Sequence, residues 1–188
     1  MGYYPVALDL EKLAVLVVGG GQLAEEKCQA FIAASPGRLA VWAEEPNESI
    51  RQWAQAGALS LLSQPPGGDE LAAFHLVVLA HSDPAENARF AQFAKACRAL
   101  VNVADDGQAS DFLAMAQVRR GPLILAVSTS GRSPALARWI RRRLEEQFPP
   151  AWGEWTETLG RLRQSWPPEE RRARVEQWLA ERLKGGGA

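Results

Sequence analysis

The sequence contains few of the residues that build disulfide frameworks or metal centres. Its two cysteines, Cys28 and Cys97, lie far apart and form no CxxC pair, so we expect neither a disulfide framework nor a zinc site. It has only two histidines and no HExxH motif, and it lacks a Walker lysine motif and a Ser-His-Asp signature. We therefore predict no metal ligands in this chain.

Long apolar runs and an excess of charge are also missing. No apolar stretch reaches the roughly 18–20 residues of a membrane-spanning helix, and residues 1–10 lack the basic start and apolar run of a signal peptide. The formal net charge of −1 argues against a general nucleic-acid binder. With 47% hydrophobic residues, the composition is that of a globular protein. We expect it in the cytoplasm, with no membrane or nucleic-acid partner.

The clearest motif lies in the stretch from Leu13 to Lys27, LAVLVVGGGQLAEEK. An apolar run predicts a strand, three glycines follow, and a helical pattern begins at once. The spacing Gly19-x-Gly21-x-x-Ala24 is typical of a dinucleotide-binding turn. Gly19 permits the tight turn, Gly21 lets the backbone approach a pyrophosphate, and Ala24 keeps the helix close to the sheet. The alternative interpretation is a glycine turn in an α/β fold without a ligand.

A pair of acids follows the second predicted strand, which covers residues 38–43. Glu44 comes 23 residues after Gly21 and is followed by Glu45. In dinucleotide-binding folds an acid near this distance binds the ribose hydroxyls. An acid at this position favours NAD over NADP, because it would repel a 2′-phosphate. The alternative is a pair of solvated loop carboxylates.

The rest of the sequence predicts an α/β protein with a Rossmann-like, doubly wound parallel sheet. The expected strands are residues 13–18, 38–43, 58–63, 74–81 and 100–104, with helices between them and a turn over 64–69. Asn47 and Asp83 are expected helix caps, and Glu86 is placed to complete a capping box with Asp83.

The pattern changes to strand-strand-helix after residue 107. Two strands, 112–120 and 122–129, and a helix capped by Ser133 suggest a small β-β-α dimerisation unit. A helical tail follows, in which tryptophans recur at helical spacing and are expected to pack in the core or an interface. We therefore divide the chain into residues 1–112, 113–148 and 149–188.

Candidate chemical groups lie near the carboxyl ends of strands, where doubly wound sheets bind ligands. Asp105 directly follows the strand that contains Asn102, and a partly desolvated carboxylate there could act as a general base. A turn-forming role is the alternative for Asp105. His81 could shuttle a proton, but we prefer a capping role. Arginines also cluster late in the chain, either as a solvated face or to bind substrate carboxylates: Arg119, Arg120, Arg132, Arg138 and Arg141 to Arg143.

Several ordered motifs extend the dinucleotide signature. They are the opening YYPVALDLEKLAVLVVGGG, the glycine turn with Lys27, the segment Asn102-Val103-Ala104-Asp105, and the segment STSGRSPALA from Ser128 to Ala137. Together, from Tyr4 to about Leu144, they resemble the siroheme synthase N-terminal family of precorrin-2 dehydrogenase and sirohydrochlorin ferrochelatase. The resemblance implies NAD-dependent oxidation of precorrin-2 to sirohydrochlorin, with ferrous iron insertion in bifunctional members, and a homodimer.

The resemblance also assigns roles to residues. It matches Asp105 to the catalytic aspartate of the family. It implies cofactor contacts from Gly19, Gly20, Gly21, Gln22, Leu23, Ala24, Glu44 and Glu45. The tetrapyrrole substrate carries several carboxylates. The resemblance therefore implies that the substrate is contacted by Asn102, Arg119, Arg120, Ser128, Thr129, Ser130, Gly131 and Arg132.

Three positions depart from the family pattern. Asp106 follows Asp105 and could share its role, Thr129 stands where a serine is common, and His81 stands where a threonine is usual. We expect no methyltransferase domain of the kind fused in some members. The alternative functions are an NAD-dependent oxidoreductase of another small metabolite, a non-catalytic dimeric NAD-binding redox regulator, and a chelatase without dehydrogenase activity.

Overall fold

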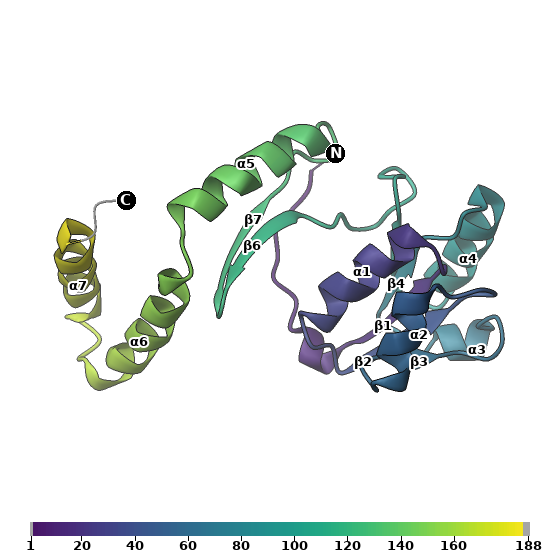
Figure 1. Ribbon diagram of the computed structural model, residues 1–188, viewed down its shortest axis with the longest axis horizontal. Helices are drawn as coiled ribbons and strands as arrows, with labels where there is room; N and C mark the ends of the chain where they lie inside the picture. Colours follow the sequence, from purple (N-terminus) through teal and green to yellow (C-terminus); the bar gives the residue numbers. More distant parts are fainter. Residues whose placement is uncertain (1, 186–188) are drawn as a thin grey trace. The chain divides into compact units, whose positions relative to one another are not determined.

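A computed structural model describes residues 2–185 of the chain (Figure 1). The chain divides into two compact units, Met1–Ala114 and Met115–Ala188, which we call the N-terminal unit and the C-terminal unit. The last three residues of the predicted helical tail lie outside the described part.

The N-terminal unit is built on a five-stranded parallel sheet with the strand order β3-β2-β1-β4-β5. Its elements are η1 (Leu10–Lys12), β1 (Ala14–Val18), α1 (Gln22–Ile32), β2 (Arg38–Trp42), α2 (Glu48–Gln55), β3 (Ser60–Leu61), α3 (Gly68–Leu71), β4 (Leu76–Leu79), α4 (Pro84–Ala96) and β5 (Leu100–Val103). Val18 pairs with Trp42 and Leu79, and Leu79 pairs with Val103. One edge of the sheet therefore gathers the loops that follow β1, β2, β4 and β5. The strand order reverses at this edge, beside β1.

The sheet is buried on both faces, as the nearly unbroken apolar runs of its strands predict. Val18 of β1 packs on one face in a cluster with Trp42 and Phe90 of α4. Val17 packs on the opposite face in a cluster with Cys28 of α1, because successive side chains of a strand alternate. Burial raises the pKa of the Cys28 thiol to about 12, since the thiolate would lose its hydration.

The outer edge of β5 is covered by the segment that follows it. Asp111 N donates to Val101 O at 2.7 Å, and Val101 N donates to Asp111 Oδ2 at 3.0 Å. Two residues further along β5, Val103 N donates to Ser110 Oγ at 2.8 Å. These bonds satisfy backbone groups that an edge strand leaves open, and they fix the turn that carries Asp105.

The C-terminal unit begins with an antiparallel hairpin. Its elements are β6 (Ala116–Arg120), β7 (Leu123–Val127), α5 (Pro134–Gln147), α6 (Ala151–Ser165) and α7 (Arg171–Gly185). Helix α5 lies along the hairpin (Figure 1). Gly153 lets α6 approach closely, because a Cβ there would lie 2.9 Å from the carbonyl oxygen of Arg120.

Aromatic rings connect the helices of the tail. Phe148 contacts Trp152, Trp152 contacts Trp155, and Trp155 contacts Trp178, with ring centroids 4.9, 5.0 and 5.9 Å apart. The tilted and edge-on geometries are those that aromatic pairs prefer. Three tryptophans of the tail, Trp152, Trp155 and Trp178, therefore pack together, in keeping with the packing role predicted for them.

The fold class predicted from the sequence is confirmed, because the parallel sheet is followed by a β-β-α arrangement and helices. The caps at Asn47, Asp83 and Ser133 are confirmed by side-chain bonds to Ile50 N, Ala85 N and Leu136 N. No helix among residues 2–185 is long and apolar enough to cross a membrane.

Two predictions about helix starts are wrong. The expected turn over residues 64–69 contains the start of α3, where Glu70 Oε2 accepts from Gly67 N at 3.3 Å and closes a cap around the helix end. Glu86 does not complete a capping box, because its carboxylate pairs with Arg89 at 2.6 Å. The N–H of Asp83 donates instead to His81 Nδ1.

Candidate functional site

Three glycines join β1 to α1 at the edge where the strand order reverses. Gly19 has a φ of +133°, which glycine adopts without strain, and a Cβ on it would lie 2.3 Å from Ala80 O. A Cβ on Gly20 would lie 2.3 Å from Glu45 O. A Cβ on Gly21 would meet no atom within 4 Å. The fold itself therefore requires Gly19 and Gly20, whereas Gly21 borders open space.

The N-terminus of α1 lies beside this open space. Gly21 precedes the helix and supplies no side-chain cap, and the first N–H groups of a helix have no intrahelical acceptor. Gln22, Leu23 and Ala24 form this first turn, with Ala24 buried against the sheet. Open space and unpaired N–H groups suit an anionic group. The residues present therefore fit the pyrophosphate of a dinucleotide.

Asn47 fastens the loop after β2 to the glycine turn. Its backbone N–H donates to Gly20 O at 2.9 Å, and its Nδ2 donates to Glu25 Oε2 at 2.6 Å. Its Oδ1 accepts from Ile50 N at 3.0 Å and caps α2. The loop that carries Glu44 is thereby bonded to the glycine turn and to α1.

Glu44 and Glu45 lie in that loop, and both side chains are exposed. Neither carboxylate has a hydrogen-bond partner among the described residues. Glu44 thus presents an unpaired carboxylate after β2, which is the place of the ribose-binding acid in dinucleotide-binding folds. Glu45 also contributes its backbone, since its carbonyl oxygen packs against Gly20.

The loop after β4 is held by a buried asparagine. His81 N donates to Asn87 Oδ1 at 3.1 Å, and Asn87 Nδ2 donates to His81 O at 2.9 Å. The imidazole lies nearly parallel to the Trp42 ring, with centroids 6.4 Å apart. Its Nδ1 accepts from Asp83 N at 3.0 Å, so His81 has the capping role that we preferred.

The turn after β5 gives its two aspartates different surroundings. Asp106 Oδ1 accepts from Gln108 N and Ala109 N, both at 3.0 Å, and thereby forms the turn. Asp105 has a φ of +64°, is exposed, and has no side-chain hydrogen bond to the described residues. The partial burial expected for Asp105 is absent. The Asp105 carboxylate is therefore accessible, whereas the Asp106 carboxylate is already bonded to backbone N–H groups of the turn.

Asn102 lies within β5 and is almost completely buried. Its Nδ2 donates to Phe112 O at 2.9 Å and lies 3.5 Å from Ser110 Oγ. These bonds hold the returning segment against the strand. The structure therefore places Asn102 beneath the Asp105 turn as a supporting residue, and its predicted contact with substrate stays a prediction.

The residues predicted to bind substrate in the C-terminal unit fall into two groups. Arg120 donates to the carbonyl oxygens of Phe148 at 2.7 Å, Arg119 at 3.0 Å and Glu145 at 3.4 Å. The Arg120 guanidinium is therefore hydrogen-bonded to backbone carbonyl groups near the C-terminus of α5. The side chains of Arg119 and Arg132 are exposed and have no ion-pair partner among the described residues.

The loop before α5 is held by its own hydroxyl groups. Ser128 Oγ accepts from Ser130 N at 3.0 Å, and Thr129 Oγ1 accepts from Ser133 N at 3.1 Å. Ser130 and Gly131 have φ values of +54° and +77°. Thr129 thus supplies the hydroxyl that a serine would supply, and the loop takes a fixed shape before any ligand binds.

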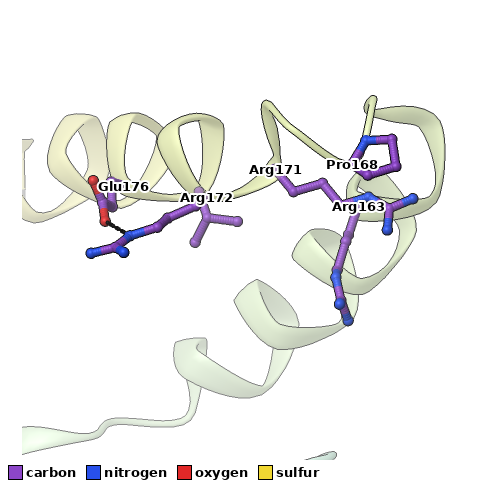
Figure 2. A pocket seen from close by; sticks show the side chains of 6 residues that line it. Arg163, Pro168, Arg171, Arg172 and Glu176 are labelled. Atoms are coloured by element: carbon purple, nitrogen blue, oxygen red, sulfur yellow. Dashed lines mark hydrogen bonds and ion pairs between the residues drawn. The ribbon is translucent and has the colours of Figure 1, made fainter.

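A cavity of about 450 Å³ lies between α6 and α7 (Figure 2). It is lined by Arg163, Pro168, Arg171, Arg172, Val175 and Glu176. Arg172 pairs with Glu176 at 3.0 Å, and Arg171 Nε donates to Trp166 O at 3.1 Å. None of these lining residues belongs to the predicted site. Among the described residues, no group of three or more His, Cys, Asp or Glu side chains could hold a metal ion.

Comparison with protein families agrees with this geometry. Residues 6–116 match the model of a family described as putative NAD(P)-binding. The chain belongs to this NAD(P)-binding family. Residues 120–147 of this NAD(P)-binding chain match a second model, described as the central part of sirohaem biosynthesis proteins. The first match covers the parallel sheet, and the second covers β7 and α5.

Curated relatives include siroheme synthases. Siroheme synthase 2 of Yersinia enterocolitica is 36% identical over 164 residues, which are 87% of this chain and 34% of that protein. The siroheme synthase of Neisseria meningitidis serogroup C is 34% identical over 163 residues, with the same coverage of 87% and 34%. The chain thus spans about a third of the length of these relatives. The resemblance to the siroheme synthase N-terminal family is confirmed.

A solved structure matches nearly the whole chain. SirC, precorrin-2 dehydrogenase, has a TM-score of 0.74 and 27% sequence identity to this chain, and the match covers 93% of this chain and 88% of that one. The likeness therefore includes the C-terminal unit as well as the NAD(P)-binding sheet.

Sequence reasoning missed residues that support the site. The sequence predicts only a helical position for Asn87, yet in the structure its side chain is buried and bonded to the backbone of His81. Asn47 was expected only to cap a helix, but it also bonds to Gly20 and Glu25. A polar residue on the buried face of α4 was the one available signal for Asn87.

Proposed function

We propose that this protein catalyses the NAD-dependent dehydrogenation of precorrin-2 to sirohydrochlorin. The observation that carries this proposal is the likeness to SirC, precorrin-2 dehydrogenase, over nearly the full length of both chains. The siroheme synthase relatives point to the same route. The glycine turn and the accessible Asp105 support the proposal, because such a reaction needs a cofactor site and a proton acceptor.

We propose NAD rather than NADP as the cofactor. Glu44 presents an unpaired, exposed carboxylate after β2. A carboxylate accepts hydrogen bonds from both hydroxyl groups of the adenosine ribose, whereas it repels a 2′-phosphate. The cradle at Gly21 and the first turn of α1 would receive the pyrophosphate.

Asp105 is the proposed base. The nicotinamide, when bound, supplies the acceptor for a hydride, so the protein has to remove the accompanying proton. The carboxylate of Asp105 is accessible and unpaired, whereas that of Asp106 is bonded to two backbone N–H groups. The turn formed by Asp106 holds Asp105 at the end of β5, which lies at the ligand-binding edge of the sheet.

The C-terminal unit has two further proposed roles. Exposed Arg119 and Arg132 would bind substrate carboxylates, for which the guanidinium geometry is well suited. Exposed Ile124, Leu136 and Trp139 would join two copies in a homodimer, because large apolar side chains on a surface often mark interfaces. We also propose that the protein works in the cytoplasm, where its two free thiols would stay reduced.

Anaerobic absorbance spectroscopy with precorrin-2 tests the proposed function. We expect sirohydrochlorin to form only when NAD is present, and to form at less than about a hundredth of the rate in Asp105→Asn, since a general base contributes roughly 10²–10⁴-fold. NAD binding without turnover would favour the redox regulator. Turnover of other substrates but not of precorrin-2 would favour another oxidoreductase. Ferrous iron added to the product then tests iron insertion.

A further inference from the structure

The His81 imidazole uses one of its two ring nitrogens within the fold. Nδ1 accepts the hydrogen bond from Asp83 N at 3.0 Å, so Nδ1 carries no proton and the hydrogen of the neutral ring is on Nε2. Nε2 has no partner among residues 2–185. His81 is therefore a hydrogen-bond donor at Nε2.

The position of His81 relative to the glycine turn indicates what this donor meets. A Cβ on Gly19 would lie 3.0 Å from His81 N, so the loop after β4 touches the turn. Strands β2 and β4 flank β1 on opposite sides, and Glu44 follows β2. A dinucleotide with its adenosine ribose at Glu44 and its pyrophosphate at the glycine turn extends its nicotinamide half toward β4.

The imidazole is fixed before any ligand arrives. Asn87 makes two hydrogen bonds to the His81 backbone, Asp83 N holds Nδ1, and the ring lies nearly parallel to the buried Trp42. A side chain that is already held loses little conformational entropy when it binds a ligand. The rigid surroundings of His81 therefore favour a binding role over that of a solvated loop residue.

We propose that His81 donates a hydrogen bond from Nε2 to an oxygen of the nicotinamide half of NAD. The proposal rests on the proposed use of NAD and adds a contact from the loop after β4, the strand on the other side of β1 from β2. This half of the ligand presents ribose hydroxyl and carboxamide oxygens, which a neutral imidazole N–H can bind. His81 would thus set the affinity for the complete dinucleotide and leave the affinity for its adenosine diphosphate part unchanged.

Two substitutions separate the binding role from the capping role. His81→Asn places an oxygen near the position of Nδ1, so it can still accept from Asp83 N, but it has no donor at the position of Nε2. His81→Gln reaches the position of Nε2 with an amide donor and gives up the acceptor for Asp83. Calorimetric titration with NADH and with ADP, together with thermal unfolding, measures both roles in the full-length protein.

We expect His81→Asn to bind NADH about three- to tenfold more weakly, which is the loss of one hydrogen bond, and to bind ADP as the wild type does. His81→Gln is expected to keep most of the NADH affinity while its melting temperature falls. The proposal is overturned if His81→Asn binds NADH normally, if ADP and NADH lose affinity equally, or if both variants bind NADH equally weakly. Wild-type turnover of precorrin-2, measured in parallel, tests the proposed function separately.

Discussion

Replacing Gly21 with alanine should weaken cofactor binding without harming the fold. Gly21 has a φ of −86° and a ψ of −169°, which alanine adopts without strain, and a Cβ there meets no protein atom within 4 Å. The new methyl group would project into the space that a pyrophosphate needs. Overpacking of this kind costs about 1–3 kcal/mol, so we expect NADH to bind roughly five- to 150-fold more weakly.

Gly20→Ala is the matched control. Its Cβ would lie 2.3 Å from Glu45 O and 2.9 Å from Ala43 Cβ, so the loop after β2 must move and the bond from Asn47 N to Gly20 O is strained. We expect a loss of about 1–3 kcal/mol in the free energy of unfolding. This corresponds to a fall of roughly 4–12 °C in melting temperature for a unit of this size.

The assay combines NADH titration followed by fluorescence with thermal unfolding of the apo proteins. The account predicts that Gly21→Ala melts as the wild type does and binds NADH weakly, whereas Gly20→Ala melts at a lower temperature. Normal NADH binding by Gly21→Ala would refute the assignment of the cradle. A melting temperature of Gly21→Ala as low as that of Gly20→Ala would refute the claim that Gly21 borders open space.

Three further predictions concern charge and burial. Glu44→Gln should narrow the preference for NADH over NADPH by about 1 kcal/mol, or roughly fivefold, as measured by titration with both nucleotides. Arg120→Ala should lower the free energy of unfolding by about 1–3 kcal/mol because it removes three bonds to carbonyl groups, whereas exposed Arg119→Ala should not; equal melting temperatures would contradict this. Burial raises the pKa of Cys28 from 9.0 to about 12, so its neutral thiol stabilises the fold fully below pH 9, and this contribution is lost as the pH rises toward 12. Denaturant unfolding at several pH values should show this loss in the wild type relative to Cys28→Ala, and alkylation at pH 8.5 should label the partly exposed Cys97 first.

Local sequence determines much of this fold. The glycine turn, the cap at Asn47 and the cap at Ser133 each depend on residues only a few positions apart, and the structure confirms these caps. Helix α5 begins at Pro134, directly after the predicted cap at Ser133. Such features can be read from sequence because the atoms that satisfy one another lie within one or two turns of chain.

Partners that are distant in sequence could not be predicted in the same way. Arg120 resembled a substrate ligand in a run of arginines, but its guanidinium reaches backbone carbonyls at Glu145 and Phe148. Composition does not tell which arginine will bind backbone carbonyl groups, because this depends on where α5 ends relative to β6. The sequence likewise did not show that the Asp106 carboxylate binds backbone N–H groups of its own turn while the Asp105 carboxylate stays accessible.

The central claim is tested most directly by the stoichiometry of the oxidation under anaerobic conditions. Purified protein, precorrin-2 and NAD are mixed, and NADH and sirohydrochlorin are measured in the same sample. The account predicts that the two products appear together in equal amounts and that neither forms without NAD. Oxidation of precorrin-2 without NADH formation, or no oxidation despite NAD binding, would contradict it.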